Sequence, residues 1–166
     1  MRTVSLALFL LLNAGLAQAQ SLPTQGEVNV TFTATNINVL KPMPIAGGKE
    51  FVVINQSMAA INAAGNPVLN DMGGRCQLTR TGDAGGKPPF EIKGWCTYAD
   101  KDGDQIFEEC AILPNSPRCS LSGGTGKFEG IRADLQITTS PIKSTYDGIT
   151  QAIGTKKGTY QISKSL

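Results

Sequence analysis

The sequence predicts an all-β protein folded as a small closed antiparallel barrel. Residues 27–39 (EVNVTFTATNINV) alternate apolar and polar side chains, the period-two pattern of a half-buried strand. Glycine and proline, with 19 and 9 residues, interrupt the chain at short intervals. No segment sustains the 3.6-residue apolar period of an amphipathic helix over three turns. Short strands separated by turns are therefore the expected elements.

The remaining strands are expected in order along the chain. Residues 49–62 (KEFVVINQSMAAIN) are rich in strand-forming side chains, although residues 58–64 also suit a helical turn by propensity. Further strands are expected at residues 74–79, 91–98, 105–113, 118–121, 126–139 and 158–164.

Closure of the sheet follows from the need to protect its edges. A row of short antiparallel strands exposes two unpaired edges, and closing it into a barrel removes both. Gly123, Gly124, Gly126 and Gly130 lie in or beside a predicted strand, where small barrels need bulges and sharp bends. These glycines favour a barrel, and a β-sandwich is the alternative.

The N-terminus reads as a secretory signal peptide. Arg2 precedes an apolar run at residues 4–12, and Ala17 and Ala19 form a small-x-small cleavage site. Cleavage is expected after Ala19, which leaves residues 20–166 as one domain. The apolar run is shorter than the roughly 20 residues of a membrane span, and no later run approaches that length. A soluble protein, secreted or periplasmic, is expected.

Charge and composition exclude several classes of function. The chain has 15 Lys and Arg against 13 Asp and Glu, and no histidine. Lys156-Lys157 is the only basic doublet and is interpreted as a solvated loop or strand edge, so no nucleic-acid partner is expected. Without histidine, Ser-His and Cys-His nucleophile systems are excluded. The glycine-rich residues 123–131 lack phosphate-loop spacing, and no cofactor is expected.

Four cysteines in an exported chain predict two disulfides. Cys76 and Cys96 lie symmetrically about Gly86, and Cys110 and Cys119 flank the turn sequence LPNSPR. Each pair therefore suits neighbouring positions in a β-hairpin, where little movement is needed to form the bond. We predict the pairs Cys76–Cys96 and Cys110–Cys119. A zinc-thiolate site is disfavoured because there is no C-x-x-C spacing.

Three aspartates, Asp100, Asp102 and Asp104, suggest either a calcium site or a turn. An EF-hand loop beginning at Asp100 would need glycine at position 6 and glutamate at position 12, and the chain has neither there. Asp102-Gly103 is instead a favoured pair for a two-residue type I′ hairpin turn. We predict the turn and no metal site, with a weak calcium site on the three aspartates as the alternative.

The predicted turn sets the register of the hairpin and hence its inner face. A two-residue turn pairs Tyr98 with Phe107 and places Glu109 on the same face as Ile92. Ile92, Tyr98 and Phe107 are then the candidate lining of a ligand site, and Glu109 and Tyr98 are candidate catalytic groups. A buried carboxylate has a raised pKa and can act as a general acid or base. A shift of one residue would bring Glu108 inside instead.

The sequence also resembles a known superfamily. The segments NDMGGRC (70–76), GWCTYADKDGDQIF (94–107), GGTGKFEGI (123–131) and GTYQI (158–162) resemble, in this order, exported bacterial members of the superfamily of allene oxide cyclases and dirigent proteins. The resemblance implies an antiparallel barrel of about eight strands with a hydrophobic interior. Plant members are often oligomeric, so a homo-oligomer is one expectation. No catalytic residue of the plant members maps onto this chain by motif.

Three functions are consistent with these observations. The first is an exported barrel that binds a small hydrophobic ligand, because the mouth of a barrel is a common ligand site and catalytic groups are few. The second is an isomerase or cyclase that confines a reactive lipid or phenolic substrate, as the plant relatives do. The third is a structural or protein-interaction module.

Overall fold

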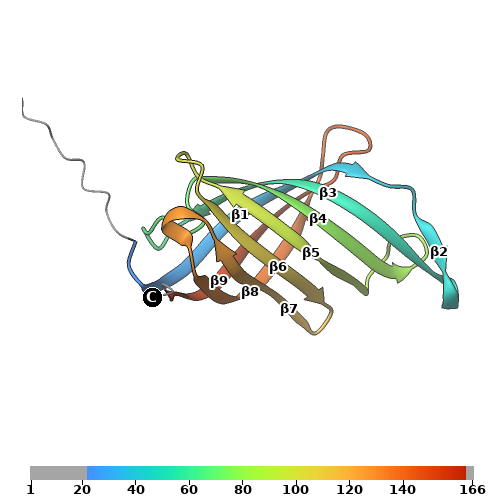
Figure 1. Cartoon of the computed structure of the whole chain (residues 1–166). Coiled ribbons are helices and arrows are strands. Elements are labelled where there is room, and N and C mark those ends of the chain that lie inside the picture. Colours follow the sequence, from blue (N-terminus) through green and yellow to red (C-terminus); the bar gives the residue numbers. More distant parts are fainter. Residues whose placement is uncertain (1–21, 164–166) are drawn as a thin grey trace, which may run out of the picture.

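A computed structural model describes residues 22–163, and the predicted signal peptide, residues 1–19, lies outside the described residues. Within this part of the chain, nine strands form one antiparallel sheet (Figure 1). They are β1 (Gln25–Val39), β2 (Met43–Ile45), β3 (Lys49–Asn62), β4 (Met72–Asp83), β5 (Phe90–Ala99), β6 (Gln105–Leu113), β7 (Ser116–Gly124), β8 (Ile131–Ile142) and β9 (Gln151–Ile162). Two short 3-10 turns, Ala46–Gly48 and Gly126–Phe128, lie before β3 and β8.

The sheet closes through its first strand. The strand order is β1-β9-β8-β7-β6-β5-β4-β3-β2, and β1 also pairs with β3. Eight strands therefore form a closed barrel, while β2 pairs only with β3 and extends the wall beyond the barrel (Figure 1). The 15-residue length of β1 allows it to pair along most of both neighbours. The all-β closed barrel predicted from the sequence is confirmed.

The two ends of the barrel differ. At one end, which we call the closed end, Val68 and Leu69 of the β3–β4 loop and Phe128 of the second 3-10 turn are completely buried. At the other end, which we call the mouth, lie β2 and the loops at residues 84–89, 114–115 and 143–150. Any site inside the barrel is therefore reached from the mouth.

The core fills the closed half of the barrel with side chains from alternate strand positions. Val28, Val30 and Phe32, which the sequence placed on one face of the first strand, are at most 3% exposed. Leu121 and Leu135 pack with them from the opposite wall. No helix among residues 22–163 has the length and apolar character needed to cross a membrane.

Most predicted strands are found, but some differ from the prediction: the last one, expected at residues 158–164, begins already at Gln151. Residues 49–62 are entirely strand, so the helical alternative at residues 58–64 is wrong. The expected strand at residues 126–139 begins only at Ile131, because Gly126–Phe128 form a 3-10 turn that lets Phe128 plug the closed end. The short strand β2 was not predicted, and its three residues carry no alternation signal.

Candidate ligand-binding site

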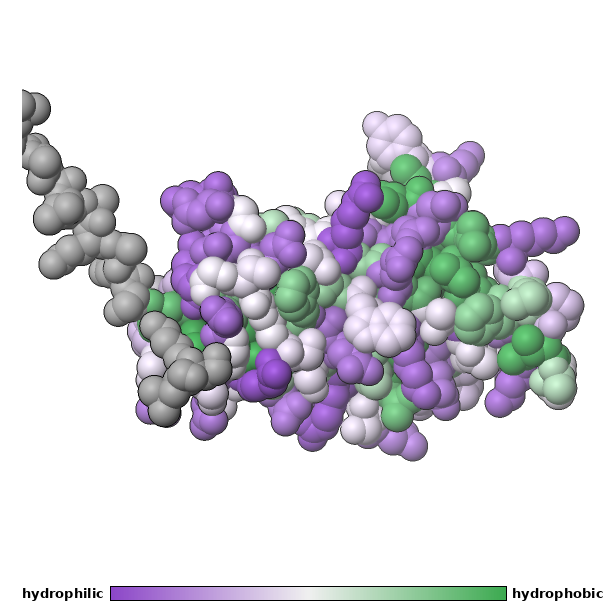
Figure 2. Space-filling view, viewed as in Figure 1, coloured by the Kyte–Doolittle hydropathy of each residue, from purple (hydrophilic) through white to green (hydrophobic). Residues whose placement is uncertain are grey.

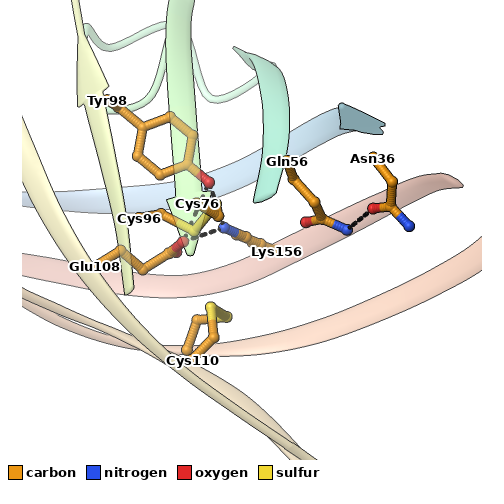
Figure 3. Close-up of a disulfide and its surroundings, with 9 residues drawn as sticks. Asn36, Gln56, Cys76, Cys96, Tyr98, Glu108, Cys110 and Lys156 are labelled. Carbon is orange, nitrogen blue, oxygen red and sulfur yellow. Dashed lines mark hydrogen bonds and ion pairs between the residues drawn. A yellow bond between two sulfur atoms is a disulfide. The ribbon is translucent and has the colours of Figure 1, made fainter. Parts of the chain in front are cut away.

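A cluster of three polar side chains lies inside the barrel, below the mouth. Tyr98 comes from β5, Glu108 from β6 and Lys156 from β9, and each is at most 1% exposed. Because β9 lies on the opposite wall from β5 and β6, Lys156 reaches across the interior to the other two (Figure 3). Its Nζ donates to Glu108 Oε2 at 2.5 Å and to the Tyr98 hydroxyl at 2.9 Å. The Tyr98 hydroxyl in turn donates to Glu108 Oε2 at 3.1 Å.

The cluster compensates its own charges. A buried ammonium or carboxylate is costly alone, and the two together form a neutral pair. The Lys156 ammonium also lies 5.1 Å from the ring centres of both Phe32 and Tyr98, in cation–π range. Burial, followed by the adjacent Glu108 carboxylate, raises the pKa of the Tyr98 hydroxyl well above its ordinary value. Tyr98 is therefore a neutral hydrogen-bonding group at physiological pH.

Two polar groups of the cluster can each form one more hydrogen bond. Among the described residues, Glu108 Oε1 is buried without a hydrogen-bond partner. The Lys156 ammonium has three N–H groups, and two of them are directed at Glu108 and Tyr98. Buried polar groups in proteins are nearly always hydrogen-bonded, so the unpaired Oε1 of Glu108 is an exception to this rule.

A cavity of about 130 Å³ adjoins the cluster on the side of the mouth. Its lining includes all but one of the disulfide cysteines, and Lys156 is the one charged side chain among the described residues that line it. The lining consists of Phe32, Ala34, Gln56, Met58, Cys76, Leu78, Ile92, Cys96, Cys110, Ile112, Ile137, Thr139, Ala152 and Lys156. The amide of Gln56 is held by Asn36, whose Oδ1 accepts from Gln56 Nε2 at 2.8 Å (Figure 3).

A groove at the mouth adjoins the cavity. This groove has a volume of about 610 Å³ and is lined by prolines and aliphatic side chains of the β4–β5 loop, β6, β7 and β8. Ile112, Ile137 and Thr139 line both spaces, so the groove and the cavity are adjacent. We call these two adjacent spaces, of which the inner one is lined by Lys156, the apolar funnel.

Both predicted disulfides are confirmed, and both lie on the inner wall. Cys76 pairs with Cys96 across β4 and β5, and Cys110 with Cys119 across β6 and β7, each in directly opposed positions. The Glu108 carboxylate lies within 4.8 Å of the sulfurs of Cys96 and Cys110. Because both sulfurs are in disulfides, they are not thiolate ligands, and this group does not form a metal site.

The predicted position of Glu109 is wrong. Tyr98 pairs with Ile106, not with Phe107, so the register differs by one residue. Glu109 and Phe107 consequently point outward and are exposed, while Glu108 points inward. Of the predicted lining, Ile92 borders the cavity and Tyr98 lies beside it through Lys156, whereas Phe107 does not.

The physical cause of this error is the length of the hairpin loop. Asp100 O accepts from Gly103 N at 3.1 Å and Asp100 N donates to Asp104 O at 3.1 Å, which leaves three residues at the tip. Gly103 takes the left-handed conformation (φ 86°) that closes such a loop. A three-residue tip shifts the pairing by one residue relative to a two-residue turn, and every side chain of β6 changes face.

The aspartates of this loop surround a lysine. Lys127 Nζ lies against Asp100, 2.7 Å from Asp102 Oδ2 and 3.6 Å from Asp104 Oδ2. Hydrogen bonds from Lys101 and Lys127 lower the pKa of the Asp102 carboxyl to about 2. The Lys127 ammonium thus occupies the position between the carboxylates that the calcium alternative assigned to the metal.

Lys156 is the residue of this candidate site that sequence reasoning missed. The doublet Lys156-Lys157 was interpreted as solvated, but only Lys157 is exposed and Lys156 is 1% exposed. Alternation along the last strand carried the signal: Lys156 has the same parity as Tyr160 and Ile162, which are also buried. A lysine in phase with the apolar positions of a strand points into the barrel.

Comparison with known proteins supports the fold. No family model matches the chain, and neither does any curated protein. Among solved structures, the chain is similar to the pterocarpan synthase dirigent protein GePTS1, with a TM-score of 0.52 and 11% sequence identity. The match covers 86% of this chain and 88% of that one. The chain therefore has the all-β, closed eight-stranded antiparallel barrel of a dirigent protein.

Proposed function

We propose that the barrel binds a small hydrophobic ligand that carries an oxygen at one end. The observation that supports this most directly is the apolar funnel that ends at the Lys156 ammonium. The groove volume lies within the range of small-molecule sites. A cavity of about 150 Å³ is known to accept a benzene-sized group, so the inner space suits one ring or a short alkyl end.

The chemistry of the cluster defines the ligand's head group. Glu108 already neutralises Lys156, so a charged head group would leave an unpaired charge in the barrel. A neutral phenol, alcohol or ketone can accept the remaining N–H of Lys156 without that cost. The similarity to a protein named a pterocarpan synthase and dirigent protein is consistent with an oxygenated aromatic ligand.

Isothermal titration calorimetry with paired ligands tests the proposal. We expect 4-alkylphenols to bind at least about tenfold more tightly than the matching alkylbenzenes, because a hydrogen bond to a charged group contributes about 1.5–3 kcal/mol. The double variant Glu108→Leu with Lys156→Met, which removes both buried charges together, should remove this difference. Ile112→Trp should abolish binding by filling the junction of groove and cavity, while Ile61→Trp, at an exposed position of β3, should bind normally. Equal binding by the two tryptophan variants would refute the site.

A second candidate function is an isomerase or cyclase acting by confinement. The remaining N–H of Lys156 can donate to a ligand oxygen at the cluster, and the free Oε1 of Glu108 can accept a proton. A bound phenolic ether or epoxide recovered with unchanged mass but a new chromatographic retention would support this function. Conversion that persists in Glu108→Gln would exclude the carboxylate from it.

A further inference from the structure

Most of the exposed large apolar side chains lie toward the mouth. The exposed set at this end consists of Ile37, Val39, Leu40, Met43, Ile45, Ile142, Tyr146, Ile149 and Ile153, and the described exceptions elsewhere are Ile61, Trp95 and Phe107. Tyr146 is 73% exposed and Met43 is 55% exposed. Exposed large apolar side chains gathered at one end of a protein are a feature of interaction sites.

Two segments far apart in the sequence carry this surface. The segment from the end of β1 through β2 meets the β8–β9 loop where Asn36 N donates to Thr150 O at 3.0 Å. Leu40 N donates to Val53 O at 3.0 Å, which holds the first segment against β3. Figure 2 shows hydrophobic side chains gathering toward this end of the molecule, interspersed with hydrophilic ones.

The charges of the two ends are opposite in sign. At the mouth, Lys41, Lys49, Lys87 and Lys143 are all exposed, against Asp83 and Asp147, while Glu50 is paired with Arg80 and Glu91 with Lys93. The loops of the closed end carry mainly acidic residues: Asp71, Asp100, Asp102, Asp104 and Glu129, against Lys101 and Lys127. The mouth is therefore both the apolar and the cationic end.

We propose that the mouth docks on an anionic lipid bilayer. Exposed aliphatic and aromatic side chains beside lysines are the combination by which proteins bind at a membrane interface, and each lysine near an anionic surface contributes about 1 kcal/mol. A second copy of the chain docked mouth to mouth would bring the lysines of the two copies together. An anionic bilayer complements both the apolar and the basic side chains.

Docking in this orientation has a consequence for the ligand. The funnel opens at the mouth, so a docked barrel exchanges an apolar ligand with the bilayer without exposing it to water. This consequence rests on the proposed ligand binding, but the docking itself does not.

Sedimentation with lipid vesicles tests the docking. We expect residues 20–166 to bind vesicles of phosphatidylcholine with phosphatidylglycerol at least about tenfold more tightly than vesicles of phosphatidylcholine alone. The variant Met43→Ser with Tyr146→Ser should bind both kinds of vesicle more weakly, because it loses apolar contacts. The variant Lys41→Glu with Lys143→Glu should lose the preference for anionic lipid. Matched controls at the closed half, Ile61→Ser and the 87%-exposed Lys101→Glu, should bind as the unmodified protein does.

Several outcomes would overturn the proposal. The proposal is wrong if the protein does not bind the anionic vesicles. It is also wrong if the mouth variants and their controls lose vesicle binding to the same extent. Light scattering that shows an oligomer dissociated by Met43→Ser with Tyr146→Ser would assign the surface to a second copy instead. Phenol binding measured without vesicles tests the proposed function separately from the docking. If only vesicle binding is lost, the docking proposal is wrong and the proposed function stands. If only phenol binding is lost, the proposed function is wrong and the docking proposal stands.

Discussion

At the scale of single residues, the stability of the barrel interior depends on the match between Lys156 and Glu108. Their ion pair is almost completely buried, with side-chain exposures of 2% and 0%. Removing one partner leaves an uncompensated buried charge, whereas removing both leaves an apolar space. The interaction is therefore expected to be strongly non-additive.

We predict that Glu108→Gln lowers the free energy of unfolding by about 3–5 kcal/mol. The double variant Glu108→Leu with Lys156→Met should be as stable as the unmodified protein, because similar apolar volume replaces both charges. Urea unfolding at neutral pH measures both. Glu109→Gln, the same substitution one position along on the outer face, should change stability by less than about 0.5 kcal/mol. If the losses measured for Glu108→Leu alone and Lys156→Met alone added up to that of the double variant, the pair would not be coupled.

From the raised pKa of Tyr98 we predict that the folded protein loses stability in alkali. Burial and Glu108 raise its pKa in the folded protein above the ordinary 10.0, so its contribution is fully present below pH 10. Above pH 10 the tyrosine of the unfolded chain loses its proton while the folded one keeps it, and the stability falls. Urea unfolding from about pH 8 to about pH 11 should show this fall.

The decrease of the free energy of unfolding with rising pH should be smaller in Tyr98→Phe. It should be unchanged in Tyr146→Phe, which alters an exposed phenol. If Tyr98→Phe lost as much stability in alkali as the unmodified protein does, other groups would be responsible for the loss.

At the scale of elements, the two disulfides link four consecutive strands along the inner wall. Cys76–Cys96 closes a separation of 20 residues and Cys110–Cys119 one of 9. By loop-closure entropy, replacing either pair with alanines should cost about 2–4 kcal/mol, and the longer loop about 0.7 kcal/mol more. Urea unfolding of the two double-alanine variants measures this difference. A larger loss for the shorter loop would indicate that packing of the sulfurs, and not chain entropy, dominates.

The same elements show how far the sequence can predict this structure. The symmetry of the cysteines about two turns predicted both disulfides, because opposed cysteines in a hairpin bond with little movement. The Asp102-Gly103 pair predicted a turn but not its length, and a two-residue and a three-residue tip place opposite faces of β6 inside. Local turn chemistry does not distinguish the two, since the choice depends on which side chains the barrel buries.

The contact of Lys156 with Tyr98 and Glu108 could not be predicted from the sequence, for a related reason. Tyr98 and Glu108 lie on adjacent strands, but their partner Lys156 is contributed by the far wall. Only closure of the sheet brings β9 opposite β6, and no local pattern encodes a contact across the barrel. The strands could be predicted one by one, whereas the site required the closed molecule.

At the scale of the whole molecule, closure through β1 and β3 is what removes the sheet's edges. Thr33 lies in the middle of this seam, paired with Ala59 of β3 and Ile153 of β9. We predict that Thr33→Pro destabilises the protein by at least about 1–3 kcal/mol, because proline removes a ladder hydrogen bond inside a central strand.

Opening the seam also exposes two strand edges, which pair readily with other chains. Thr33→Pro should therefore aggregate on mild heating, as measured by light scattering. Thr33→Ala, which keeps the backbone N–H, should stay within about 1 kcal/mol of the unmodified protein and remain dispersed. If Thr33→Pro had the same melting temperature as Thr33→Ala and did not aggregate, the pairing of β1 with β3 would not be what protects the strand edges. The pairing of β2 with β3 would then have to protect them instead.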